Sequence, residues 1–381
     1  MADSWPTQYW PLTYPYWPVT YPYWPTYTEP AAPIPSTDAR PFRVFDRYGK
    51  PLAELDVDVD SVTWRLNKTG FAKIRIAKTV PKAIRDYLRF YNRILLQFSN
   101  GLPDWGGILT PSRDWGDGEI VLSSYDAAEI LEGRITNASR SFNQTPAGTI
   151  YQTLIEEANA ILDTGLDIGT VWTGGSLRSP ATYHYARLMT KINDLSVLTG
   201  NDFAFVPYLT AGGRLRWWAH WYERRGSDKP DVALIEGHNV QVLKFTEVGP
   251  ITNVWATYGD GATWTDKPKY SISDAASISE YGRLENSRSF TGVVNSDTLE
   301  ENTDELLRET KQPRNRFSLR AIDRAPAQFA DYDIGDRIKL QLHTFGFSGA
   351  TFGYDAMIRI LERSYSPTLG LCDLVVEEYV E

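Results

Sequence analysis

The C-terminal stretch from Tyr332 to Glu378 decides the fold. It reads YDIGDRIKLQL over residues 332–342 and MIRILERSYSPTLGLCDLVVEE over residues 357–378. Apolar residues share a parity within each predicted strand, which is the two-residue period of a half-buried strand. They are Ile334, Ile338, Leu340 and Leu342, then Ile358 and Ile360, then Cys372, Leu374 and Val376. DIGD at 333–336 and SPTLG at 366–370 are turn signals, because Gly, Asp and Pro supply the backbone angles of tight corners. The stretch therefore predicts an antiparallel meander with no helix.

A similar layout lies near the N-terminus, between Phe42 and Leu122. Short alternating runs recur there at regular spacing, which is typical of a barrel or sandwich. Leu55, Val57 and Val59 alternate with aspartates, and Val62, Trp64 and Leu66 form another alternating run. We place a turn at Asp60-Ser61 between these two strands.

The region between these two β-rich parts has helical patterns and a hairpin. Thr149 and Gln152 resemble a capping box that opens one helix, and a second helix is predicted from about 182 to 199 with Gly200 as its stop. A later helix is expected to be capped by Asp297 and Glu300.

The fold class is mainly β with an α+β insertion, and the expected domains are residues 1–41 (extended arm and linker), 42–145 (first tube-like antiparallel β-barrel), 146–245 (insertion) and 246–381 (second tube-like β-barrel).

The arm contains a seven-residue repeat, YWPLTYP, YWPVTYP and YWPTYTEP, between residues 9 and 30. Proline at two positions of each repeat blocks a helix, so an extended polyproline-like conformation is expected. Exposed aromatic rings need a covering surface, which is either the chain's own body or a partner. The candidate partner-contact residues in the arm are Trp10, Tyr16, Trp17, Tyr23 and Trp24.

A second candidate contact lies in the run RWWAHWY at residues 216–222. In a strand, Trp217 and Trp221 face one way, and Trp218 and Tyr222 face the other. One pair is expected in the core and the other at an interface, so Trp218 and Tyr222 are partner-contact candidates as well. A sugar-stacking or base-stacking platform is the alternative interpretation.

Composition limits the classes of function. The chain has 381 residues, a net charge of −9 and a single cysteine. An acidic chain is unsuited to gripping a nucleic-acid backbone, which needs clustered Lys and Arg. No apolar run approaches the roughly 20 residues of a membrane helix, and no secretory signal is recognised at the N-terminus. The length predicts two or three domains.

No sequence motif points to catalysis, a cofactor or a metal. The four histidines, His184, His220, His238 and His343, lack metal-ligand spacing. The Asp56-x-Asp58-x-Asp60 run lacks the later positions of a calcium loop, so calcium is a minor option. We therefore expect a non-enzyme, although distant carboxylate pairs suited to glycoside hydrolysis stay open as an alternative.

Several motifs in order resemble the tail-tip (baseplate) hub proteins of tailed bacteriophages. They are NKTGFAKIRI at 67–76, ILLQF at 94–98, WGGI at 105–108, YGRLE at 281–285, the helix near 297–312, DIGDRI at 333–338 and RILERSY at 359–365. The resemblance covers residues 42–381, and the aromatic arm has no counterpart in it. We see no appended lysozyme or peptidase domain.

The resemblance implies a homotrimer with two tube-like barrels in each chain, giving a pseudo-sixfold ring. Its implied partners are the tail-tube or distal tail protein, the tape-measure protein and a tail fibre or spike, with DNA only passing through the lumen. Its implied location is the tail tip of the virion, after synthesis in the host cytoplasm. The alternatives are a carbohydrate-binding tail adhesin and a cell-wall glycosidase.

Overall fold

The structure is a computed structural model, and it describes residues 42–55, 57–77, 86–116, 118–136, 140–175, 177–178, 181–183, 185–248, 252–290, 293–343 and 353–378. The expectations for the N-terminal arm therefore lie outside the described residues.

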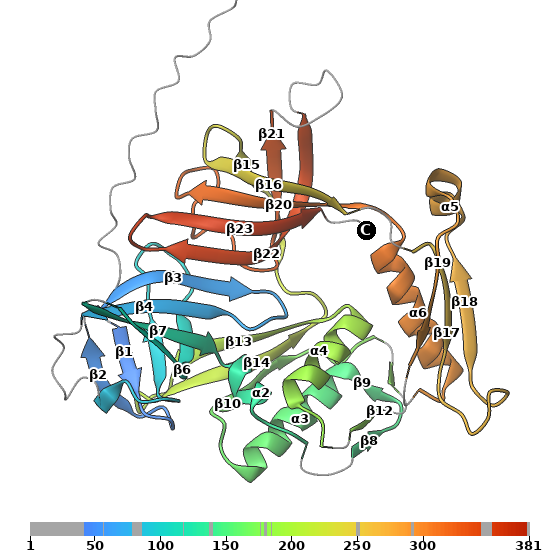
Figure 1. Ribbon diagram of the computed structural model, residues 1–381, viewed down its shortest axis with the longest axis horizontal. Coiled ribbons are helices and arrows are strands. Elements are labelled where there is room, and N and C mark those ends of the chain that lie inside the picture. The colour runs from blue at the N-terminus through green and yellow to red at the C-terminus, as the bar shows by residue number, and fades with distance from the viewer. Residues whose placement is uncertain are drawn as a thin grey trace, which may run out of the picture.

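One 13-stranded sheet organises the molecule (Figure 1). Its main path runs in the order β16-β20-β23-β22-β3-β4-β7-β6-β5-β1-β2, and β21 and β15 branch from β22. All its pairs are antiparallel except β15 with β21. The first half consists of β1 (Phe42–Phe45), β2 (Pro51–Leu55), β3 (Asp58–Arg65), β4 (Phe71–Ala77), β5 (Arg93–Leu96), β6 (Trp105–Trp115) and β7 (Glu119–Asp126). The second half consists of β15 (Asp228–Ile235), β16 (Val240–Val248), β20 (Arg314–Ile322), β21 (Arg337–Leu342), β22 (Tyr354–Ser366) and β23 (Leu371–Glu378).

The C-terminal meander is confirmed. β21, β22 and β23 pair antiparallel in succession, and their apolar positions alternate with exposed or half-buried ones. Gly335 has φ +90° in the turn that precedes β21, and an added Cβ would lie 2.6 Å from the carbonyl oxygen of Arg225. The turn therefore needs glycine both for its backbone angle and for this close approach.

The two halves of the sheet are joined by β3 and β22. Thr63 Oγ1 lies 2.9 Å from Ser364 Oγ, and Arg65 Nε donates to Glu362 at 2.8 Å across this pair. A single apolar core extends through both halves, from Phe42 and Ile74 to Leu340 and Val376. The fold is thus mainly β and antiparallel, as predicted, and no closed barrel is detected among its described strands.

The predicted turn at Asp60-Ser61 is wrong. β3 runs unbroken from Asp58 to Arg65, and its register with β4 shifts between Val59 and Ser61. One extra residue at this β-bulge moves the buried positions from odd to even numbers. The change of parity in the sequence therefore marks a bulge within one strand.

The insertion packs helices against a small three-stranded sheet. The sheet has the order β10-β14-β13 and its strands are β10 (Leu166–Val171), β13 (Asp202–Leu209) and β14 (Leu215–Tyr222). The helices are α2 (Ala128–Glu132), α3 (Ala147–Ile161) and α4 (Leu188–Thr199), and two short pairs are formed by β8 (Arg140–Phe142) with β12 (Ala181–Tyr183) and β9 (Thr145–Pro146) with β11 (Leu177–Arg178).

Two expectations about these helices need correction. α3 begins before Thr149, with Pro146 at its N-cap and no side-chain cap, so Thr149 and Gln152 form no capping box. Gln152 instead donates to Glu156 one turn later. α4 starts at Leu188 rather than near 182, but it does end at Gly200, which has φ +66°.

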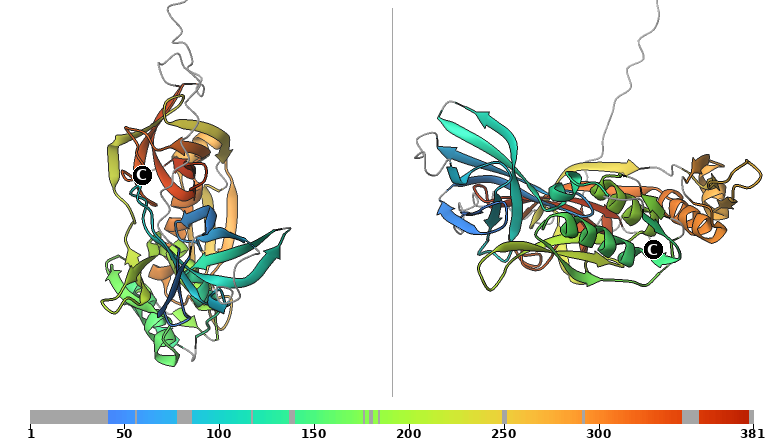
Figure 2. Two further views of the ribbon diagram at one scale, coloured as in Figure 1. Left: turned by 90° about the vertical axis from the view of Figure 1, so that its left-hand side faces the viewer. Right: turned by 90° about the horizontal axis from the view of Figure 1, so that it is seen from below.

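A satellite unit lies to one side of the body (Figures 1 and 2). It contains the sheet β18-β17-β19, with β17 (Val254–Tyr258), β18 (Lys269–Ser273) and β19 (Glu285–Ser289), and the helices α5 (Ala275–Tyr281) and α6 (Ser296–Thr310). The predicted cap of α6 by Asp297 is wrong, because Asn295 accepts from Asp297 N at 2.7 Å. Arg178, itself nearly buried, ties the satellite to the body through Asn302 and the carbonyl of Leu198.

Candidate functional site

The hairpin of β13 and β14 presents one aromatic face to solvent. Trp217 and Trp221 are fully buried against the helices of the insertion, as the alternation predicts. Trp218 is 37 % exposed and Tyr222 is half-buried on the opposite side. We call this opposite side the aromatic face, and define it by Val206, Tyr208, Trp218, His220 and Tyr222.

The rings of the aromatic face are stacked in two pairs. Tyr208 and Trp218 have ring centroids 4.4 Å apart at an interplanar angle of 12°. His220 and Tyr222 are 5.4 Å apart at 21°. Val206 lies directly opposite Trp218 on the neighbouring strand, with 37 % exposure. The pairs hold the rings in fixed orientations, so a ligand would meet a preformed apolar surface.

Charged groups at the border of this face neutralise one another. Arg216 donates to both oxygens of Asp167 and to both oxygens of Asp163, and Tyr208 donates to Asp167. The hydrogen bonds from Arg216 lower the pKa of Asp163. Burial alone would raise the pKa of Asp167, but hydrogen bonds from Arg216 and Tyr208 outweigh it and lower the pKa. Burial, with the bond to Asp167, raises the pKa of Tyr208 to about 12, so Tyr208 stays a neutral donor.

His220 belongs to the same face as a neutral ring. Its Nδ1 accepts from Thr170 N at 2.9 Å, and the ring lies over Gly169, where an added Cβ would approach it to 2.5 Å. Burial and the nearby Arg225 lower the pKa of His220. The aromatic face therefore carries no unpaired ion among these residues.

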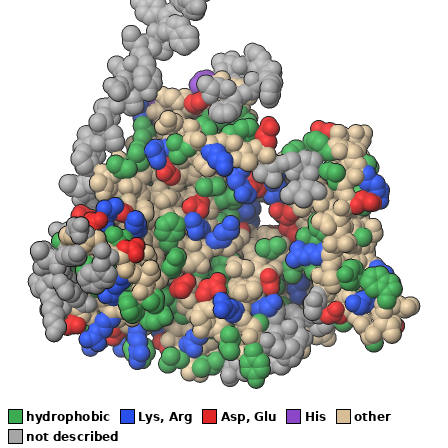
Figure 3. Space-filling model, in the orientation of Figure 1, with side chains coloured by type: hydrophobic (Ala, Val, Ile, Leu, Met, Phe, Trp, Pro, Cys, Tyr) green, Lys and Arg blue, Asp and Glu red, His purple; other side chains and the backbone are tan. Residues whose placement is uncertain are grey.

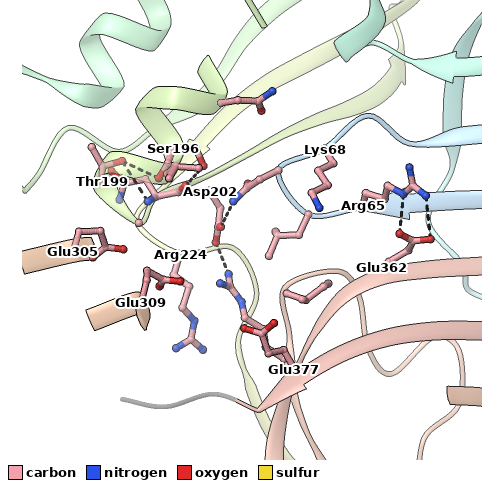
Figure 4. Close-up of a pocket in the computed structure, with 18 of the residues that line it drawn as sticks. Arg65, Lys68, Ser196, Thr199, Asp202, Arg224, Glu305, Glu309, Glu362 and Glu377 are labelled. Atoms are coloured by element: carbon pink, nitrogen blue, oxygen red, sulfur yellow. Dashed lines mark hydrogen bonds and ion pairs between the residues drawn. The ribbon is translucent and has the colours of Figure 1, made fainter. Parts of the chain in front are cut away.

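A second feature is a charged cleft of about 1010 Å³ where the sheet, the insertion and the satellite meet (Figure 4). Its walls come from β3, α4, β13, α6, β20, β22 and β23. Figure 3 shows acidic and basic side chains interspersed over this side of the molecule. The cleft was not predicted, because its lining residues are scattered from Arg65 to Glu378.

Five of the seven carboxylates that line the cleft are paired with arginines. The pairs are Arg65–Glu362 at 2.8 Å, Arg308–Glu305 at 2.7 Å, Arg314–Glu309 at 2.9 Å, Arg314–Glu377 at 3.0 Å, Arg316–Glu377 and Arg359–Asp202. Asp202 is almost fully buried, and it also accepts from Asn67 Nδ2 at 2.8 Å and from Arg225 N at 2.6 Å. The cleft is therefore a seam whose charges bind its own walls together.

The candidate metal ligands and the single cysteine lie in surroundings that give them a structural role. Among the described residues, no group of three or more His, Cys, Asp and Glu is arranged to hold a metal. Asp60 pairs with Arg75 at 2.6 Å, and Asp56 lies outside the described part. Cys372 is fully buried, and burial raises the pKa of its thiol to about 11. No helix in the described ranges has the length and apolar character of a membrane span.

One half-buried carboxyl, that of Asp126, has a pKa suited to acid–base chemistry but takes no part in either feature described above. Burial raises the pKa of Asp126 to about 7. Its oxygens accept from Gly70 N at 2.6 Å and Ala128 N at 3.0 Å. The side chain therefore holds two backbone segments together, and it is absent from the cleft lining.

Of the partner-contact candidates, the structure describes only Trp218 and Tyr222, which it brings onto one face. Trp10, Tyr16, Trp17, Tyr23 and Trp24 lie outside the described residues. Sequence reasoning missed Tyr208, Asp167 and Arg216. Their meeting depends on the parallel pairing of β10 with β14, which leaves no local signal in the sequence.

Comparison with known proteins gives a likeness at the level of fold. No protein-family model matches the chain, and no curated protein matches its sequence. Three solved structures share the fold over nearly the whole chain. Prophage tail protein gp18 from Listeria monocytogenes has 12 % identity and a TM-score of 0.58, covering 89 % of this chain and 95 % of its own.

The other two structures are also tail proteins. The 43 kDa tail protein of prophage MuSo2 from Shewanella oneidensis has 12 % identity and a TM-score of 0.56, with 88 % of this chain and 98 % of the other covered. A tail protein from Neisseria meningitidis has 11 % identity and a TM-score of 0.55, with 89 % and 97 % covered. This chain therefore has the fold of these tail proteins.

Proposed function

We propose that this chain is a structural hub of a phage tail tip. Its function would lie in contacts with other protein chains and not in a catalysed reaction. Three copies would form a ring that joins the tail tube to the tip and surrounds the tape-measure protein and, later, the passing DNA. The likeness to three tail proteins over 88–89 % of the chain supports a tail role. The net charge of −9 favours passage of DNA rather than capture.

The ring proposal rests on the two edge strands at the ends of the main sheet. β2 and β16 are the end strands of the main path, and each pairs with one described strand there. Unpaired strand edges are templates for pairing with another chain. Heterologous contacts of this kind generate closed rings when the rotation closes. Each chain would give two tube-like modules, one built on β1–β7 and one on β15, β16 and β20–β23, so the second module would begin before residue 246. Three chains would then give a pseudo-sixfold arrangement.

The proposal has a direct test in solution and on particles. Light scattering coupled to gel filtration should give the mass of three chains, and gold-labelled antibodies should mark only the tail tip in electron micrographs. A monomer together with label along the shaft, on fibres or on no particle would contradict it.

An edge substitution tests the ring in more detail. Leu243 is 46 % exposed on β16, at a shift in its register with β20. Leu243→Lys should weaken the trimer by placing a charge in the edge contact. Leu369→Lys is the matched control, because Leu369 is 51 % exposed in the turn between β22 and β23. Equal trimer fractions in the two variants would exclude the β16 edge as the contact.

A carbohydrate-binding adhesin is a second candidate, favoured by one exposed aromatic site. Trp264 is 60 % exposed in the loop between β17 and β18, with the Tyr258 ring at 5.2 Å and Lys269 Nζ at 4.6 Å from its ring. Titration with host surface glycans should change the tryptophan fluorescence of the protein but not of the Trp264→Ala variant. An unchanged signal in both proteins would reject this candidate.

A further inference from the structure

We propose that the aromatic face of β13 and β14 binds the chain's own proline–aromatic arm, residues 4–30. The arm is contributed by the same chain, because its tether ends close to that face. The inference depends on the face and on the arm's sequence, and it holds or fails independently of the tail function.

The arm carries two segments of a kind that aromatic surfaces recognise. PYWP occurs at residues 15–18 and again at residues 22–25. In a polyproline II helix, with three residues per turn and a rise of about 3.1 Å per residue, the two prolines of each segment lie on one side, about 9 Å apart. Such Pro-x-x-Pro segments dock on aromatic-lined surfaces at low entropic cost, because their conformation is largely preformed.

The spacing of the rings on the aromatic face suits this ligand. The Tyr208–Trp218 pair and the His220–Tyr222 pair lie along the same strands. Trp218 is two residues from His220 and four from Tyr222, which corresponds to about 7 and 13 Å along a strand. These distances bracket the proline spacing of about 9 Å, so the two prolines of one segment can each contact one ring pair.

Charge points to the same occupant. Residues 4–28 contain no Asp, Glu, Lys or Arg. The ions that border the aromatic face are already paired, Arg216 with Asp163 and Asp167. An uncharged aromatic ligand therefore buries no unpaired ion there, whereas in the charged cleft it would separate ion pairs without replacing them.

The connection between arm and body is long enough. The described chain begins at Phe42 in β1, and the turn after β1 contacts the start of β14, where Leu215 N donates to Gly49 O at 2.8 Å. Residues 31–41 include three prolines and would span about 34 Å at 3.1 Å per residue. The tether thus keeps the repeat close to the aromatic face and raises its effective concentration there.

Hydroxyl-radical footprinting of the full chain tests the proposal. The comparison protein carries Pro15→Ala, Pro18→Ala, Pro22→Ala and Pro25→Ala, which leave the described fold untouched. Oxidation of Trp218 and Tyr222 should rise several-fold in this variant, because the arm no longer covers them. Trp264 is the internal control and should be oxidised equally in both proteins. Equal oxidation of Trp218 in the two proteins overturns the proposal.

A cross-linking experiment identifies the occupant directly. A photo-reactive phenylalanine analogue replaces Val206 in the full chain, and mass spectrometry identifies the peptide that it captures. Capture of a peptide from residues 4–30 is expected, in a product with the mass of one chain. A product with the mass of two chains would overturn the assignment to the chain's own arm. The same analogue in place of Trp264 should not capture the arm. Capture of another segment, or of none, at position 206 overturns the proposal.

Discussion

The buried carboxylate of Asp202 should contribute several times more to the free energy of unfolding than a surface carboxylate that also pairs with an arginine. Asp202 has 3 % side-chain exposure, and it accepts from Asn67 Nδ2, Arg225 N and Arg359. Asp202→Asn removes the charge and turns an amino group toward groups that are themselves donors. Breaking a buried pair by changing one partner costs about 3–5 kcal/mol, because it leaves the other charge unpaired.

The matched control is Asp373→Asn. Asp373 accepts from Arg320 at 2.8 and 3.0 Å, but the two side chains are 45 % and 40 % exposed. Exposed pairs contribute about 0–1 kcal/mol. The two variants make the same chemical change, so the difference in unfolding free energy between them isolates burial and should be about 3 kcal/mol.

Urea unfolding followed by tryptophan fluorescence measures both variants at neutral pH. A third variant, Asp202→Asn with Arg359→Met, removes the stranded charge and should be no less stable than Asp202→Asn alone. If the free energies of Asp202→Asn and Asp373→Asn differ by less than about 1 kcal/mol, the seam is not held by this carboxylate and the reasoning fails.

Three further outcomes follow from the described contacts. Burial raises the pKa of Asp126 to about 7, so the stability that its protonated carboxyl contributes is present below pH 4 and is lost as the pH rises through 7. Asp126→Asn should therefore flatten the fall in Tm between pH 5 and 8. An unchanged slope of Tm against pH would refute this reasoning. Gly106→Ala places a Cβ 2.6 Å from Pro207 Cβ and should lower the unfolding free energy by about 1–3 kcal/mol. Gly116→Ala is the control and should change it little, because its added Cβ lies 3.6 Å from Glu119 Cγ. Equal changes in Tm for the two variants would contradict the reasoning. Arg178→Gln should speed hydrogen exchange in α6 but not in α3, since it removes the bond to Asn302 that holds the satellite; equal exchange in both proteins would show that other contacts hold it.

The sequence predicted elements whose periodicity is local. The C-terminal meander, the β13–β14 hairpin and the opposite orientations of Trp217 and Trp218 follow from alternation, which a strand converts directly into two faces. The stop of α4 at Gly200 follows in the same way from a single residue's backbone preference. These features need no knowledge of the partner strand.

Features that depend on distant pairing were missed. The parity change at Asp60 fits both a turn and a bulge, and only the unbroken pairing of β3 with β4 distinguishes them. Thr149 and Gln152 have the spacing of a capping box, but the helix begins earlier because Pro146 can occupy its start. The joint between β3 and β22 brings together residues about 300 positions apart, and no local pattern encodes such a partner.

β22 has a mechanical consequence as the shared member of the sheet. One of its edges is divided, with β21 along Tyr354–Arg359 and β3 along Glu362–Tyr365, while β23 runs along the other edge across both. A load that pulls the two halves apart along the strands would shear the ladder between β22 and β3, because this is the described strand pairing that joins them. The pairing of Glu362–Tyr365 with Val62–Arg65, together with the ion pair between Arg65 and Glu362, therefore sets the resistance of the sheet to such a load.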